Sequence, residues 1–109
     1  MAQYSEFINY VMDQLHGMGE FETKNMFGGT AILRNGNAFA KIKHGTFWLK
    51  VDDSNLNDFI EKGMNQYTYG KDNSRKLNFY ETPAEILEDQ ESLIQWANKA
   101  CKAAVKKKK

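Results

Sequence analysis

The most constraining feature of the sequence is a pair of turn signals inside one long β-prone segment. Residues 23–53 read TKNMFGGTAILRNGNAFAKIKHGTFWLKVDD. Asn-Gly between two extended runs is the strongest short-range signal for a tight hairpin, and Asn35-Gly36 occupies that position. His44-Gly45 is a weaker signal placed where a second hairpin would turn. The segment therefore predicts an antiparallel meander with strands near 24–34, 37–43 and 46–51.

A double glycine, Gly28-Gly29, lies inside the first of these extended runs. A phosphate-binding loop would need a following Gly-Lys-Ser/Thr, or three spaced glycines that open a helix, and neither pattern is present. Glycine within a strand more often marks a bulge, a sharp bend or the close approach of another backbone. We therefore interpret the MFGG motif, Met26, Phe27, Gly28 and Gly29, as structural, with Met26 and Phe27 entering the core.

Helical periodicity appears at both ends of the chain. Apolar residues recur at helical spacing from Tyr4 to Leu15, and again from Leu93 to Ala104. Asp89 is suited to cap the last helix, and Thr82-Pro83-Ala84-Glu85 has the form of a capping box with proline at the first helical position.

The segment between the meander and the C-terminal helix predicts one more helix and two strands. Residues 52–64 predict a short helix capped by Asp53 or Ser54 and ended by Gly63. Residues 65–70 and 76–81 alternate tyrosine, leucine and phenylalanine with polar residues, as strands do. The polar stretch between them predicts a loop.

The order of these elements predicts an α+β fold in two layers. It runs helix, three-stranded antiparallel meander, helix, two strands and C-terminal helix. The length of 109 residues suits a single domain over 1–105. The four lysines of 106–109 form a basic tail, and without them 11 basic residues face 14 acidic ones. We expect that tail to be a solvated terminus.

Composition also limits the cellular location of the protein and the kinds of reactive site that it can contain. The single cysteine, Cys101, cannot form an internal disulfide. No apolar run approaches the ~18 residues of a membrane span, and the N-terminus lacks the pattern of a secretion signal, so we expect a cytoplasmic protein without membrane contact. His16, His44 and Cys101 fall on three different elements without metal-ligand spacing. We predict no metal, no cofactor and no catalytic residue.

The aromatic residues of the strands are the candidate binding residues. If Phe47 points into the core, alternation turns Trp48 outward with Lys50 beside it. We select Trp48, Lys50, Tyr67 and Tyr69 as the candidate partner-binding residues. Three interpretations stay open: burial by the chain itself, contact with a protein partner or a second copy, and stacking on nucleic-acid bases.

Several motifs in order resemble the N-terminal domain of the TfoX/Sxy family, regulators of bacterial natural competence. They are MFGG after an N-terminal helix, FWLKVDD, FIEKGM followed by YTY, LNFYETP and LEDQESLIQWANKA. The resemblance spans roughly residues 5–104. It implies an α+β fold similar to secretion chaperones, with a curved antiparallel sheet. It also implies a link to the transcriptional control of DNA uptake, with no established catalytic role.

The expected function is therefore a non-catalytic regulatory module that binds a protein partner or a second copy of itself. Longer family members carry a second, C-terminal domain, and this sequence ends at Lys109 before any counterpart. We thus expect a standalone domain. The alternative function is a nucleic-acid-binding accessory protein that uses the lysine tail and the loop over 71–76, where Lys71, Arg75 and Lys76 lie.

Overall fold

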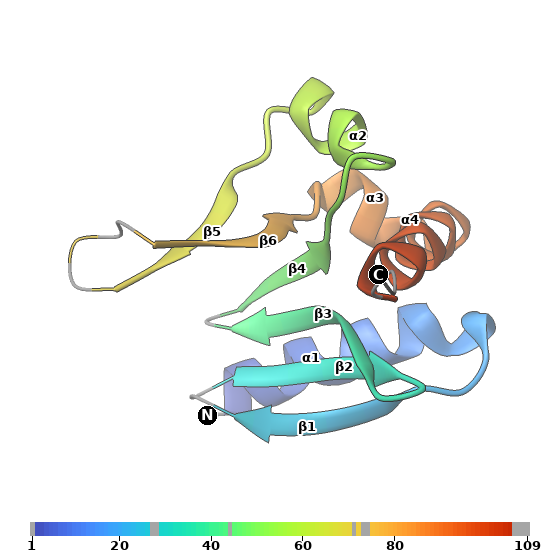
Figure 1. Ribbon diagram of the computed structural model, residues 1–109. Helices are drawn as coiled ribbons and strands as arrows, with labels where there is room; N and C mark the ends of the chain where they lie inside the picture. The colour runs from blue at the N-terminus through green and yellow to red at the C-terminus, as the bar shows by residue number, and fades with distance from the viewer. Residues whose placement is uncertain (1, 27–28, 44, 71, 73–74, 106–109) are drawn as a thin grey trace.

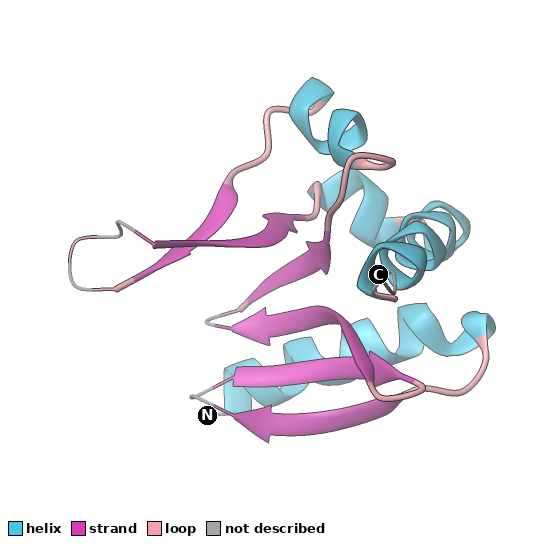
Figure 2. Ribbon diagram, viewed as in Figure 1, coloured by secondary structure: helices cyan, strands magenta, loops and turns pink. Residues whose placement is uncertain are grey.

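A computed structural model describes residues 2–26, 29–43, 45–70, 72 and 75–105 of the chain. It confirms the α+β class (Figures 1 and 2). In chain order the elements are α1 (Ala2–Leu15), the 3-10 turn η1 (His16–Met18), β1 (Glu22–Met26), β2 (Gly29–Arg34), β3 (Asn37–Lys43), β4 (Thr46–Lys50), α2 (Leu56–Glu61), β5 (Gln66–Tyr69), β6 (Arg75–Glu81), α3 (Ala84–Glu88) and α4 (Gln90–Ala104).

The described strands form one six-stranded antiparallel sheet in the order β1-β2-β3-β4-β6-β5. Strands β1 to β4 follow each other as neighbours, and β5 lies outside β6 at the edge. Helices α1 and α4 pack on one face of this sheet (Figure 1). The fold therefore has two layers, as the element order predicted.

The predicted single strand over 24–34 is wrong, because the chain reverses inside it. Met26 pairs with Gly29 and Asn25 with Thr30, so β1 and β2 form an antiparallel pair. The meander thus has four strands instead of three. Phe27 and Gly28, which join the two strands, lie outside the described residues. Two adjacent glycines allow such a reversal, but Phe-Gly is not one of the common hairpin-turn dipeptides.

The Asn35-Gly36 turn is confirmed. Asn35 has φ +54° and Gly36 has φ +80°, and Arg34 pairs with Asn37 directly across the turn. Two consecutive residues with positive φ are typical of the type I′ hairpin turn, which asparagine and glycine accept at little cost. This turn sets the pairing of Arg34 with Asn37 and of Leu33 with Ala38, and the register then shifts by one residue at Ile32, which pairs with Ala40.

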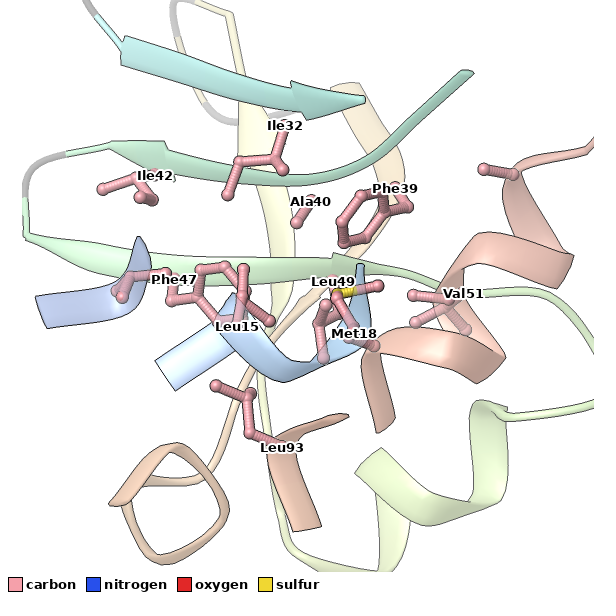
Figure 3. Close-up of a cluster of buried hydrophobic side chains, with 14 of the residues drawn as sticks. Leu15, Met18, Ile32, Phe39, Ala40, Ile42, Phe47, Leu49, Val51 and Leu93 are labelled. Atoms are coloured by element: carbon pink, nitrogen blue, oxygen red, sulfur yellow. The ribbon is translucent and has the colours of Figure 1, made fainter. Parts of the chain in front are cut away.

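The core lies between the sheet and the two long helices (Figure 3). Phe47, Leu49 and Val51 point into it from β4 and its end, as alternation predicted. On α4 the buried face is made of Leu93 and small alanines, which let the helix lie close to β3. The fully buried side chains of the cluster include Val11, Leu15, Ile32, Phe39, Ala40, Leu49, Leu93, Ala97 and Ala100.

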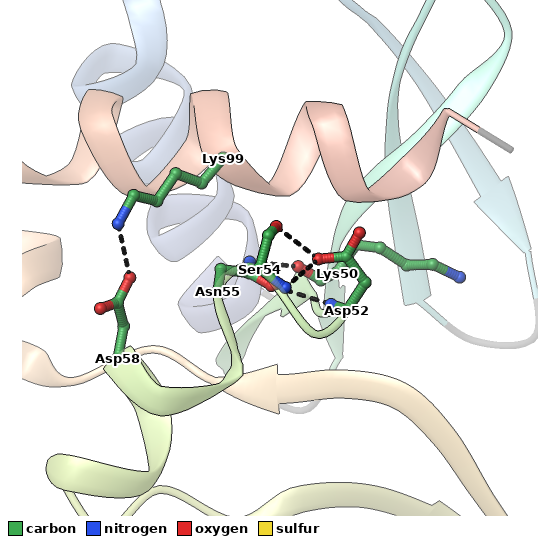
Figure 4. Close-up of polar contacts among 6 residues, drawn as sticks. All are labelled: Lys50, Asp52, Ser54, Asn55, Asp58 and Lys99. Atoms are coloured by element: carbon green, nitrogen blue, oxygen red, sulfur yellow. Dashed lines mark hydrogen bonds and ion pairs between the residues drawn. The ribbon is translucent and has the colours of Figure 1, made fainter. Parts of the chain in front are cut away.

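The connection from β4 to α2 is held by a buried asparagine (Figure 4). Asn55 is only 2% exposed. Its side-chain oxygen accepts a hydrogen bond from Asp52 N at 2.8 Å, and its Nδ2 donates to Lys50 O at 3.0 Å. Asp52 Oδ1 in turn accepts hydrogen bonds from the backbone N and the hydroxyl of Ser54. The side chains therefore brace the turn itself and do not cap the helix.

The short helix predicted at Thr82-Pro83-Ala84-Glu85 is confirmed as α3, but the predicted capping is wrong at two of the three helix starts. Asn55, and not Asp53 or Ser54, is the residue before α2. Pro83 precedes α3 instead of starting it, and the Thr82 hydroxyl is buried with no hydrogen-bond partner, so the capping box does not form. Asp89 does precede α4, and its carboxylate accepts a hydrogen bond from Ser92 Oγ at 2.7 Å. Gly63 follows α2 with φ +72°, as expected for a helix end.

Among the described residues, no helix combines the length and the apolar character that crossing a membrane requires.

Candidate functional site

The sheet face that points away from α1 and α4 carries a row of lysines and aromatic rings. Lys41 on β3 pairs with Trp48 on β4, and Lys50 on β4 pairs with Phe79 on β6. Directly opposite residues point to the same face of a sheet. Because Phe47 and Leu49 point into the core, Trp48 and Lys50 lie on this outer face.

Strands β5 and β6 continue beyond the central sheet as a two-stranded arm (Figure 1). Gln66 pairs with Tyr80, yet Thr68 pairs with Lys76, so Tyr67 alone stands opposite residues 77–79. Extra residues on one strand bend and twist a β-ribbon. The irregularity therefore redirects the arm where it leaves β4.

The bend brings Tyr67 against the outer face of β3 and β4. Its ring lies edge-on to the Trp48 ring, with centroids 4.8 Å apart. No hydrogen bonds join β5 to β4 in the sheet order. An open cavity of about 780 Å³ lies between the two parts. Lys43, Thr46 and Trp48 line it from the meander, and residues of the arm, including Tyr67, Tyr69 and Lys76, line it from the other side. We call this cavity the arm cleft.

Lysine ammonium groups lie over the aromatic rings beside the arm cleft. Lys41 Nζ is 4.7 Å from the centroid of the Tyr67 ring and 5.4 Å from that of Phe79. Lys43 Nζ lies 5.9 Å from Tyr67, and Lys50 Nζ lies 5.1 Å from Phe79. All four distances fall within the range of cation–π attraction, which is worth about 0.5–1 kcal/mol at exposed sites. The rings thus hold three positive charges close together.

Charge is unevenly distributed between the two sides of the molecule. The strand register assigns four lysines to the outer face, Lys24, Lys41, Lys43 and Lys50, against the acidic residues Glu22 and Glu81. Helices α2 and α3 and the start of α4 carry the carboxylates Asp58, Glu61, Glu85, Glu88 and Glu91, of which Asp58 is paired with Lys99 and Glu85 with Lys62. The outer face is therefore the basic side of the folded domain.

The sequence profile of the TfoX N-terminal domain matches residues 13–104. The chain belongs to the TfoX N-terminal domain family. The match covers most of the 109 residues and confirms the resemblance read from the ordered motifs. A search among curated proteins found no match. In this TfoX N-terminal domain, the described residues of the arm cleft all fall inside the matched region.

Trp48 and Tyr67, which the sequence selected, do lie together in the TfoX N-terminal domain. Tyr69 lines the same cleft and is 41% exposed, which makes it an accessible aromatic group on the rim. Lys50 lies on the same face but reaches Phe79 instead of the cleft. Trp48 Nε1 is buried and has no hydrogen-bond acceptor among the described residues. Partner binding by these residues stays a prediction.

Three residues of the site were missed from the sequence: Lys41, Lys43 and Phe79. Lys41 and Lys43 alternate with the buried Ala40 and Ile42 on β3. This period-two pattern assigns both lysines to the outer face and would have revealed them. Phe79 needed the β4–β6 register, which the sequence alone does not give.

The structure supports the structural interpretation of the double glycine at Gly29. That residue begins β2, not a helix, and a Cβ there would lie 2.7 Å from Ile42 O and 3.3 Å from Lys43 Cβ. Glycine therefore allows the β3 backbone to approach closely, one of the three roles expected from the sequence. Phe27, Gly28 and the side chain of Met26 lie outside the described residues, so their part in the motif stays a prediction.

The other reactive side chains do not converge. His16 lines a separate open cavity of about 690 Å³ with Asp13 and Glu20. Cys101 is half-buried on α4, and burial raises the pKa of its thiol, an effect that the Arg34 guanidinium partly offsets. Within the described ranges, no group of three His, Cys, Asp or Glu side chains is arranged to hold a metal ion. His44, Lys71 and the tail over 106–109 lie outside those ranges.

Proposed function

We propose that this TfoX N-terminal domain is a non-catalytic regulatory module that binds an acidic segment of a protein partner in the arm cleft. The observation that carries the proposal is the pair of lysines Lys41 and Lys43, whose ammonium groups lie over the Tyr67 ring, with Lys43 and Lys76 lining the arm cleft. Family membership suggests the process, which is the regulation of natural competence in the bacterial cytoplasm.

The chemistry of the face favours carboxylates as ligands. A lysine ammonium has three donors and no acceptor, so an ammonium over a ring still has donors for an anion. One exposed lysine–carboxylate pair contributes only about 0.2–1 kcal/mol. Several pairs along the cleft are needed for useful affinity, and a segment with repeated acidic residues supplies them. Binding of this kind weakens as salt screens the charges.

The burial of the rings argues against base stacking as the main mode of recognition. Tyr67 is 7% exposed and Phe79 is 8% exposed, and lysines lie over both rings. Single-stranded nucleic acid binds by stacking bases on open aromatic faces. Tyr69 is the exposed aromatic residue of the arm cleft, and one ring gives a single stacking position.

The non-catalytic part of the proposal is supported by the placement of the candidate nucleophile. A thiol reacts as the thiolate, and the raised pKa of Cys101 leaves little thiolate at neutral pH. Its sulfur accepts a hydrogen bond from Arg34 at 3.8 Å, and a guanidinium is not a general base. The TfoX N-terminal domain family is also not known as an enzyme family.

The test is a fluorescence anisotropy titration with a labelled peptide that alternates glutamate and glycine. We expect saturable binding that weakens with added salt and falls at least tenfold in the Lys41→Glu/Lys43→Glu double variant. Lys102→Glu, an exposed site on α4, is the control and should bind nearly as the unmodified protein does. The matched glutamine-glycine peptide should not bind.

The same titration with a labelled DNA duplex distinguishes the proposed protein partner from the alternative, which is binding to nucleic acid. Tighter binding of DNA than of the acidic peptide, lost in the same double variant, would replace the protein partner with nucleic acid. Equal binding by the double variant and by Lys102→Glu would contradict the proposal for both ligands.

A further inference from the structure

The edge strand β5 lacks the charged residues and the proline that often protect a sheet edge, although it is only four residues long and its pairing with β6 is irregular at Tyr67. Soluble proteins keep edge strands from pairing with other chains by placing charged residues or proline on them. Strand β1, at the other edge of the described sheet, has Glu22 and Lys24. Strand β5 reads Gln-Tyr-Thr-Tyr and has neither charge nor proline. Thr68 and Tyr69 on it are exposed, Tyr67 is packed against Trp48, and no described strand pairs with its outer edge.

The sequence of this edge is also self-complementary. Tyr67-Thr68-Tyr69 reads the same in both directions. Antiparallel pairing of two such strands, centred on Thr68, places threonine opposite threonine and each Tyr67 opposite the other copy's Tyr69. Aromatic–aromatic and Thr–Thr pairs are among the favourable cross-strand pairs. In a two-fold arrangement, each of the three residues therefore faces a favourable partner on the other copy.

From these observations we propose that β5 is a homodimer edge, where a second copy of this chain pairs antiparallel about Thr68. The two sheets then form one continuous sheet. The contact is isologous and closes at two copies, since each β5 has a single open edge. It also gives the two-stranded arm a third and a fourth strand, and two-stranded ribbons are only marginally stable on their own.

Charge beside the edge sets the salt dependence of the dimer. Arg75 and Lys76 lie on β6, directly next to β5. In the dimer the two β6 strands lie three strand spacings apart, about 14 Å. That is shorter than the screening length of about 30 Å at 0.01 M salt and longer than that of about 8 Å at physiological ionic strength, so the like charges repel at low salt and are largely screened at physiological salt. Raising the salt concentration from about 0.01 M to about 0.15 M should therefore strengthen the dimer, which is the opposite of its effect on an acidic ligand in the arm cleft.

Sedimentation equilibrium over a range of protein concentrations, at low and at high salt, tests this proposal. We expect reversible dimerisation that tightens several-fold with salt. Thr68→Lys puts two lysines face to face at the two-fold axis and should abolish the dimer. Thr23→Lys is the matched control, because Thr23 is an exposed threonine on the other edge strand, and it should dimerise as the unmodified protein does. Circular dichroism confirms that each variant is folded.

A mixing experiment keeps the proposal falsifiable if the lysine variant is monomeric for another reason. Thr68→Lys and Thr68→Glu proteins should each be monomeric alone and should dimerise when mixed, because opposite charges then meet at the axis. A protein that stays monomeric at millimolar concentration in high salt would overturn the proposal. So would loss of the dimer in Thr23→Lys, or failure of the mixed variants to associate.

Failure of the dimer can be told apart from failure of acidic-peptide binding, because the two depend on different residues. The dimer needs the backbone edge of β5, whereas acidic-peptide binding needs Lys41 and Lys43 on β3. Because Thr68 also lines the arm cleft, the variant that separates the two proposals is Lys41→Glu/Lys43→Glu, which should lose peptide binding and keep the dimer.

Discussion

Gly29, the first residue of β2, lies against the backbone of β3. The distance between the two strands there leaves no room for a side chain at residue 29. A methyl group would lie 2.7 Å from Ile42 O, and a strand backbone moves only together with its hydrogen-bonded neighbours. Gly29→Ala should therefore lower the free energy of unfolding by about 1–3 kcal/mol, as overpacking does. Urea denaturation measures the change. Thr23→Ala, at an exposed site on β1, should stay within about 0.5 kcal/mol.

Cys101 links the environment of one side chain to the pH dependence of stability. Burial raises the pKa of its thiol, and the Arg34 guanidinium at 3.8 Å offsets part of that rise. The folded state therefore holds this proton more tightly than the unfolded state does. The contribution to stability is fully present below the ordinary thiol pKa of about 8.5 and is lost as pH rises through the higher folded value.

This sign gives a measurable expectation. The free energy of unfolding should fall as pH rises above about 8.5, and the fall should be smaller in Cys101→Ala. The rate of alkylation by iodoacetamide should reach half its maximum at a higher pH in the folded protein than in urea. A lower midpoint in the folded protein would show that Arg34, and not burial, dominates the pKa of the thiol.

At the scale of elements, the turn between β4 and α2 depends on one buried side chain. Asn55→Ala removes two hydrogen bonds and leaves the partly buried Asp52 N and Lys50 O without those partners. We expect a loss of about 1–3 kcal/mol in the free energy of unfolding. Asn57→Ala changes an exposed asparagine of α2 and should stay within about 0.5 kcal/mol. A similar loss in both variants, measured by urea denaturation, would show that Asn55 has no special role.

The arm should open more easily than the rest of the sheet. Arg75 and Lys76 of β6 pair with β5 beyond the β4–β6 register, so only two strands hold the arm there. Amide hydrogens of 66–69 and 75–77 should exchange faster than those of β3 and β4 in hydrogen-exchange experiments at low salt and low protein concentration. Equal protection in both regions would contradict this description of the arm.

The elements also show which parts of the fold sequence reasoning could reach. The Asn35-Gly36 turn and the apolar faces of α1 and α4 follow from local chemistry, and they were predicted correctly. The β1–β2 reversal was missed because glycines that turn the chain and glycines that permit close approach have the same sequence pattern. The bend at Tyr67 depends on pairing between β5 and β6, which a linear pattern does not contain.

At the scale of the whole molecule, the two sides differ in charge, and this shapes the proposed function. Period-two alternation on β3 and β4 is enough to place Lys41, Trp48 and Lys50 on one face. It does not reveal that β5 folds over this face and encloses a cleft. The candidate residues were therefore predictable one by one, whereas their assembly required the three-dimensional structure.

The most direct test of the binding site is a nuclear magnetic resonance titration of the isotope-labelled domain with the glutamate-glycine peptide. We predict that the amides of residues 41–43, 46–50 and 66–69 shift most, and that those of α2 and α3 stay almost unchanged. Larger shifts on α2 and α3 than on these strands would contradict the assignment of the arm cleft as the binding site.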